Sequence, residues 1–152
     1  GQDGILFTLA ANAGQSPAPL HKCASGGELS RIMLAMKMVF AKVNPVGTMI
    51  FDEIDSGMGG AAADAVGGKL SALSTHCQVM AITHAPQIAA MGDAHFVVAK
   101  TDADGVTTTS VTPLPGLEDR REEIARMLSG AQITDQARQA AAALMGRDRD
   151  VA

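Results

Sequence analysis

The most regular pattern of apolar and polar positions in this chain is a helical one. Apolar residues from Leu29 to Val43 recur at positions i, i+3, i+4, i+7, i+10, i+11 and i+14, which is the spacing of one helix face. Ser25, with Glu28 three residues later, forms a capping-box pattern before this stretch, and Pro45 follows it. We therefore predict a helix that begins after Ser25 and ends before Pro45.

Two continuous apolar runs, residues 48–51 and 78–83, have the length of strands that are buried on both faces. The other predicted elements are a strand over 5–10, an Ala-rich helix ending near 73, a short helix over 86–91, a hairpin of strands 94–100 and 106–111, and closing helices over 118–128 and 135–145. Strands that alternate with helices predict an α/β fold with a mainly parallel sheet flanked by helices.

Polar side chains follow both buried strands. Asp52 and Glu53 come directly after the first strand, and His84 comes after the second. Open α/β sheets hold ligands at the carboxyl ends of their strands, so adjacent parallel strands would bring these groups to one edge. There Asp52 is placed to hold Mg²⁺, Glu53 to orient or deprotonate a water, and His84 to contact a phosphate or that water. The alternatives are a solvated turn for the acidic pair and a structural role for His84.

A second polar group opens the predicted long helix. An anion site is predicted from Ser25, Gly26, Gly27 and Glu28, because a helix start offers backbone N–H groups, a hydroxyl and a positive dipole end. Ordinary helix capping is the alternative for this group.

The loop that follows the acidic pair is rich in glycine. The glycines at 57, 59 and 60 permit backbone shapes that other residues cannot hold, so this loop can pass close to a partner, and Asp55 could bind the loop to that partner. A plain turn is equally compatible with the sequence.

The phosphate-binding loop of nucleotide-hydrolysing enzymes is missing from the sequence. The pattern G-x-x-x-x-G-K-[ST] occurs nowhere, and the nearest string, Gly67 to Leu70, has leucine where a hydroxyl is needed. Nothing in the chain then cradles the β- and γ-phosphates of ATP. We expect the chain alone to bind ATP weakly or not at all.

Composition narrows the class of protein. The formal net charge of −4 comes from 16 acidic and 12 basic residues, and only 3% of residues are aromatic, so an extended nucleic-acid surface is disfavoured.

The sequence shows no signal-peptide pattern and no apolar run long enough to span a membrane. Cys23 and Cys77 have no metal-binding or redox spacing. The length fits one domain, and we expect a soluble cytoplasmic protein.

Taken together, these segments resemble the RecN family, bacterial DNA double-strand-break repair ATPases related to the SMC proteins. Residues 22–31 are similar to the ABC signature motif of that family, 48–53 to Walker B, 55–60 to the D-loop, and 82–91 to the switch-histidine segment with its RecN-type continuation. The resemblance covers almost the whole chain. ABC transporters usually have glutamine where Glu28 stands, and general SMC heads differ after His84.

The resemblance implies that residues 1–152 are the C-terminal half of an ABC-type, SMC-like ATPase head of the P-loop NTPase class. It implies ATP and Mg²⁺ as cofactors, with the acidic pair and His84 serving the ATP of their own head and residues 25–28 reaching the ATP of a second head. The implied partners are the N-terminal P-loop half, a second copy of the head, and double-stranded DNA bound by the full-length protein at the nucleoid. Without the P-loop half, the sheet is expected to lack neighbouring strands.

Three other functions are compatible with the same residues. The chain could belong to the head of another SMC or ABC-type ATPase. A stand-alone Mg²⁺-dependent phosphohydrolase using Asp52, Glu53, Asp55 and His84 would show turnover by this chain alone. A non-catalytic interaction module that keeps an ATPase-like shape only to dimerise would show no ATPase activity even with a P-loop partner.

Overall fold

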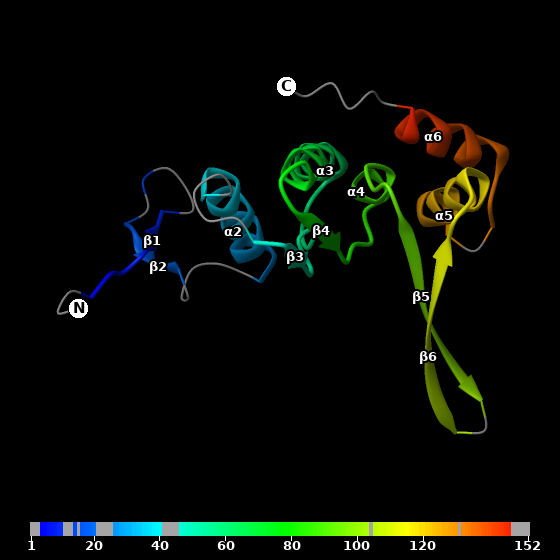
Figure 1. Ribbon diagram of the computed structural model, residues 1–152, viewed down its shortest axis with the longest axis horizontal. Coiled ribbons are helices and arrows are strands. Elements are labelled where there is room, and N and C mark those ends of the chain that lie inside the picture. Colours follow the sequence, from blue (N-terminus) through cyan, green and yellow to red (C-terminus); the bar gives the residue numbers. More distant parts are fainter. Residues whose placement is uncertain are drawn as a thin grey trace. The chain divides into compact units, whose positions relative to one another are not determined.

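The computed structural model of the chain (Figure 1) describes residues 4–10, 14, 16–20, 26–40, 46–103, 105–130 and 132–146. These residues form two compact units. The first unit holds the described residues up to Met58 together with Leu73–Ile82, and the second holds Gly59–Ala72 and the described residues from Thr83 onward. The elements in chain order are β1 (Thr8–Leu9), β2 (Ala18–Pro19), α2 (Gly26–Phe40), β3 (Thr48–Phe51), α3 (Gly60–Ser74), β4 (Gln78–Ala81), α4 (Pro86–Ala90), β5 (His95–Ala103), β6 (Val106–Leu114), α5 (Leu117–Ser129) and α6 (Asp135–Met145).

Strands β3 and β4 lie side by side in the first unit and run parallel. Thr48 pairs with Gln78 and Phe51 pairs with Ala81. The N–H of Ile82 also donates to the carbonyl of Phe51 at 2.9 Å. The predicted strands are therefore present and adjacent, although β4 ends at Ala81, earlier than the predicted residue 83.

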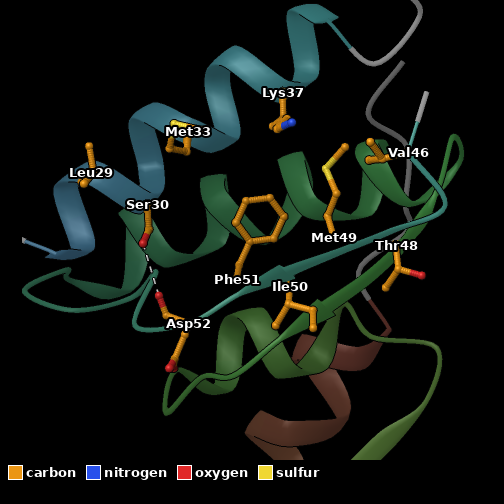
Figure 2. A pocket seen from close by; sticks show the side chains of 10 residues that line it. All are labelled: Leu29, Ser30, Met33, Lys37, Val46, Thr48, Met49, Ile50, Phe51 and Asp52. Carbon is orange, nitrogen blue, oxygen red and sulfur yellow. Dashed lines mark hydrogen bonds between the residues drawn. The ribbon is translucent and has the colours of Figure 1, made fainter. Parts of the chain in front are cut away.

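The two faces of this parallel pair differ in burial. Met49 and Phe51 are only 8% and 6% exposed, whereas Ile50 and its register partner Met80 are 66% and 48% exposed. Ile50 points to the opposite side of β3 from Met49 and Phe51 (Figure 2). Parallel sheets normally have both faces covered by other elements. Within the described residues, the first unit is thus a half-sheet with one uncovered apolar face.

The other described strands pair antiparallel. β1 pairs with β2 over two residues, and β5 pairs with β6. The mainly parallel sheet of the prediction is therefore represented in the described residues by the β3–β4 pair alone. The predicted strand over 5–10 was too long and covers only Thr8–Leu9, which matches the two residues of its partner β2; beyond β2, the N–H of Leu20 donates to the carbonyl of Phe7 at 3.1 Å.

Helix α2 confirms the helical pattern but not the burial of its whole apolar stripe. Leu34 is 3% exposed, whereas Leu29, Met33 and Phe40 are 40%, 41% and 52% exposed. Periodicity predicts which residues share a helix face, but burial of that face needs a second layer packed on it. Both predicted end signals, at residues 25 and 45, lie outside the described residues.

The second unit has its own hydrophobic core, made by α4, α5 and α6. Its buried members are Ala90, Ile124, Ala125, Ala137 and Ala141. Helices α5 and α6 pack together (Figure 1), and Arg138 of α6 pairs with Glu122 of α5 at 2.7 Å. Thr134 caps α6, because its Oγ1 accepts a hydrogen bond from the N–H of Ala137 at 3.1 Å. The bounds of both closing helices lie within one residue of the prediction.

Strands β5 and β6 form the predicted hairpin (Figure 1). It is longer than predicted, with His95 paired to Leu114 at its base. The threonines of β6 are β-branched, which favours extended backbone and lets the ladder continue beyond the apolar residues. Gly105 has a φ of 76° next to the turn, a backbone shape that suits glycine, and Asp104 lies outside the described residues.

His95 is a half-buried residue at the start of β5. Burial and the nearby Arg120 guanidinium lower the pKa of His95 below its ordinary value of 6.5. Arg120 donates hydrogen bonds to the carbonyls of Gly92 and Asp93. Because protonation of His95 is disfavoured in the folded state, its contribution to stability is lost as the pH falls below that ordinary value.

Two adjacent glycines of α3 make a matched test of its packing on α4. A Cβ atom at Gly67 would lie 3.2 Å from Cγ of Met91, whereas a Cβ at Gly68 would meet nothing within 4 Å. Gly68→Ala is expected to raise the free energy of unfolding by up to about 1 kcal/mol, because alanine is the better helix former. Gly67→Ala should gain less or lose stability. Urea unfolding of both variants tests this, and equal gains would contradict the close approach of α3 and α4.

Candidate functional site

The predicted catalytic acids lie in an exposed turn directly after β3. Asp52 and Glu53 are both exposed, and the N–H of Ser56 donates to the carbonyl of Glu53 at 3.0 Å to close the turn. Glu53 has a φ of 54°, the one positive φ of a residue other than glycine among the described residues. Such backbone shapes are uncommon and concentrate at functional sites. The turn therefore sets the backbone position from which the Glu53 side chain projects.

The start of α2 packs directly on this turn. Gly27 is buried, and a Cβ atom there would lie 2.9 Å from Cβ of Ser56 and 3.0 Å from the carbonyl oxygens of Glu53 and Ser56. Only glycine fits this approach without a shift of the backbone. A Cβ at Gly26 would lie 3.5 Å from Oε2 of Glu53, so the carboxylate of Glu53 lies beside the first residue of the helix.

Two polar side chains of α2 hold the same turn. The Ser30 hydroxyl donates to the carbonyl of Asp52 at 3.2 Å (Figure 2). Nη1 of Arg31 donates to the carbonyls of Ile54 at 3.3 Å and Ser56 at 3.1 Å. Neither side chain was among the site residues predicted from the sequence. The available signal was position: Arg31 lies four residues after Gly27, on the same helix face.

Two further predicted site residues lie near the acidic turn in sequence and belong to the same unit. Glu28, in the first turn of α2, and Asp55, in the turn after β3, are half-buried residues of the first unit. Ser25 lies outside the described residues. The structure therefore brings Gly26, Gly27 and the two acids together, while the hydroxyl predicted to complete the anion site is not described.

His84 belongs to the second unit. It is exposed and stands between Thr83 and the short helix α4, whose first residue is Pro86. The N–H of Ala85 donates to Oγ1 of Thr83 at 3.0 Å, which fixes the backbone on both sides of the histidine. The segment thus presents the His84 imidazole to solvent at the entry to α4.

A hollow of about 470 Å³ lies between α2 and β3 (Figure 2). Most of its lining is apolar, and the polar members are Ser30, Lys37, Thr48 and Asp52. An apolar lining with one cation is unlike a phosphate cradle, which needs converging backbone N–H groups and a lysine. The hollow is better explained as packing surface that the described residues leave uncovered.

The acidic turn fits a Mg²⁺ ion only in part. Mg²⁺ is usually held by one or two carboxylates together with substrate phosphates and waters, and Asp52 supplies one exposed carboxylate. Within the described ranges, no three His, Cys, Asp or Glu side chains come together as a metal site. The donor set therefore suits a metal that arrives with a nucleotide.

None of the helices within the described part of the chain is both long and apolar enough to cross a membrane.

Comparison with known proteins gives a consistent result. The chain matches the DNA repair protein RecN of Xylella fastidiosa strain 9a5c with 48% identity over 145 residues, 95% of this chain and 26% of that protein. It matches the RecN proteins of Treponema pallidum with 53% identity (86% of this chain, 22% of that protein) and Bacillus subtilis with 45% identity (89% and 23%). The chain thus spans about a quarter of the length of these relatives. No family model matches it.

Solved structures show the same fold. An SMC ATPase structure, from work on ATP-driven dimerization and DNA-stimulated activation, matches with a TM-score of 0.54 and 24% identity over 86% of this chain and 77% of that chain. The SMC head domain of Pyrococcus yayanosii, solved with a coiled coil and joint, matches with a TM-score of 0.54 and 26% identity, covering 74% of this chain and 20% of that chain. The expected SMC-like head fold is confirmed. With close to half of its residues shared with these relatives over most of its length, the chain belongs to the RecN family.

Proposed function

We propose that this chain is the C-terminal part of the ATPase head of a RecN-type DNA repair protein. The observation that carries the proposal is the close packing of Gly26 and Gly27 on the turn of Asp52 and Glu53. One compact unit thus joins a helix start suited to a phosphate with a pair of exposed acids that follow β3, a strand with one buried face.

Each residue has a distinct role in this proposal. Asp52 binds Mg²⁺, which when present neutralises phosphate charge on the bound ATP. Glu53 orients the attacking water and accepts its proton, and His84 contacts the γ-phosphate of the same nucleotide. The start of α2, residues 25–28, binds the ATP of a second head, with Asp55 at the interface between the heads.

A P-loop half is the first partner in this proposal. The chain has no phosphate-binding loop, and its β3–β4 pair leaves Ile50, Met80 and Ile82 between 48% and 66% exposed. A parallel sheet needs a covering layer on such a face. We assign that layer to the N-terminal P-loop half of the same protein, which also supplies the missing phosphate cradle.

The second partner is another copy of the head, and the third is double-stranded DNA. The SMC relative studied for ATP-driven dimerization and DNA-stimulated activation supports this part of the proposal. RecN relatives that are named DNA repair proteins support a role in DNA repair, and we propose that this role is double-strand-break repair at the nucleoid.

Mg²⁺-ATP hydrolysis by the chain, alone and mixed with its P-loop half, tests the proposal. We expect no turnover by the chain alone, because nothing in it binds the β- and γ-phosphates. Turnover should appear on mixing and should depend on Mg²⁺. Hydrolysis by the chain alone would indicate a stand-alone phosphohydrolase. A mixture that associates but stays inactive would indicate a non-catalytic interaction module.

A further inference from the structure

The backbone carbonyls of the turn after β3 are shared between two sets of donors. Those of Glu53 and Asp55 accept N–H groups from within the turn, at 3.0 and 3.1 Å. The carbonyls of Asp52, Ile54 and Ser56 accept instead from side chains of α2. Every carbonyl from 52 to 56 is thus satisfied, alternately by the turn and by the helix.

Arg31 supplies two of the three contacts from α2. A single Nη1 atom serves the carbonyls of Ile54 and Ser56, and Arg31 forms no ion pair within the described ranges. Hydrogen bonds from a charged donor are stronger than neutral ones. Because Ile54 is fully buried and Gly27 packs against Ser56, the guanidinium closes a contact that has little freedom to slide.

We propose that Arg31 is a positioning residue that fixes the Glu53 turn to the start of α2, so that the two move as one body. The inference rests on the proposed function. In a dimer of heads, the start of α2 would face the ATP of the partner while Glu53 faces the ATP of its own head. Arg31 then links the two sites. When the ATP of the partner binds to the start of α2, it also sets the position of the Glu53 carboxylate at the ATP of its own head.

The test uses a full-length RecN protein that carries this chain, with the variants Arg31→Met, Arg31→Lys and the control Lys37→Met on the same helix. Arg31→Met should lower kcat at saturating ATP by at least ~10-fold while KM for ATP changes less than ~3-fold, because the nucleotide still binds but the carboxylate is misplaced. Arg31→Lys should restore turnover to within ~3-fold of wild type, since an ammonium has rotatable donors for both carbonyls. Lys37→Met should match wild type.

Hydrogen exchange of residues 53–58 gives a readout independent of turnover. These amides should exchange faster in Arg31→Met and return toward wild type in Arg31→Lys. If Arg31→Met does not fold, Ser30→Ala takes its place, because it removes only the contact to Asp52. It should lower kcat by ~3-fold while KM for ATP stays close to the wild-type value.

Failure of the proposed function and failure of this inference look different. If the wild-type protein does not hydrolyse ATP, both the proposed function and the positioning role of Arg31 are contradicted. If the wild type is active and Arg31→Met has a normal kcat, the positioning role is overturned. It is also overturned if ATP binding and thermal stability of Arg31→Met fall together with turnover and Arg31→Lys does not restore turnover.

Discussion

Replacing Glu53 with glutamine is expected to abolish ATP turnover in the full-length protein while ATP binding and head dimerisation remain. Glutamine has nearly the same shape and can still contact the bound water, but its amide cannot accept the proton. General-base contributions of this kind are worth ~100-fold or more in rate. The turn that holds Glu53 at a φ of 54° depends on backbone contacts, and these should survive the change.

Steady-state hydrolysis, ATP binding and ATP-dependent dimerisation, all on the same protein, check this expectation. Glu118→Gln, which removes an exposed carboxylate paired with Arg121 on α5, is the matched control and should leave all three readouts unchanged. A Glu53→Gln protein that hydrolyses ATP at the wild-type rate would remove Glu53 from the catalytic role. Loss of ATP binding would show instead that the side chain has a structural role.

Adding one methyl group at Gly27 is expected to be far more harmful than adding it at Gly26. Alanine in place of a helical glycine normally stabilises by about 1 kcal/mol. At Gly27 the new Cβ would lie at 2.9–3.0 Å from Ser56 and from the carbonyl of Glu53, so α2 must shift away from the turn. Overpacking of this kind destabilises by about 1–3 kcal/mol. At Gly26 the nearest atom is at 3.5 Å, an ordinary contact.

Urea unfolding and hydrogen exchange of the two alanine variants distinguish these cases. Gly27→Ala should unfold at lower urea and lose protection in residues 53–58, whereas Gly26→Ala should keep or gain stability. ATP-driven dimerisation should also fail in Gly27→Ala, because the helix start and the acids no longer share one position. Equal stability of the two variants would contradict the close packing of α2 on the turn.

Much of the fold followed from the sequence because its signals are local. Periodicity predicted α2, and apolar runs predicted the parallel neighbours β3 and β4. The exposed stripe of α2 and the bare face around Ile50 could not be read from residue types, because burial depends on whether a second layer is present. Periodic apolar residues look the same with and without that layer.

The candidate site was predictable in part, for a similar reason. Acids at a strand end and glycines at a helix start have chemical meaning as residue types, so Asp52, Glu53, Gly26 and Gly27 could be singled out. Arg31 was missed as a contact to the turn because its acceptors are backbone carbonyls, which every residue carries and no sequence pattern marks. The left-handed backbone of Glu53 was missed because glutamate has no preference for it.

The bare face of the β3–β4 pair has a consequence for how the protein folds and is degraded. On that face Ile50 and Met80 are 66% and 48% exposed, so their apolar side chains meet water until a covering layer packs on them. Cooperative units with fewer buried contacts open at lower free energy. Without that layer, the β3–β4 pair should open more readily, and be cut faster by a protease, than it does after assembly. An unassembled head would thus present to proteases the side that assembly hides.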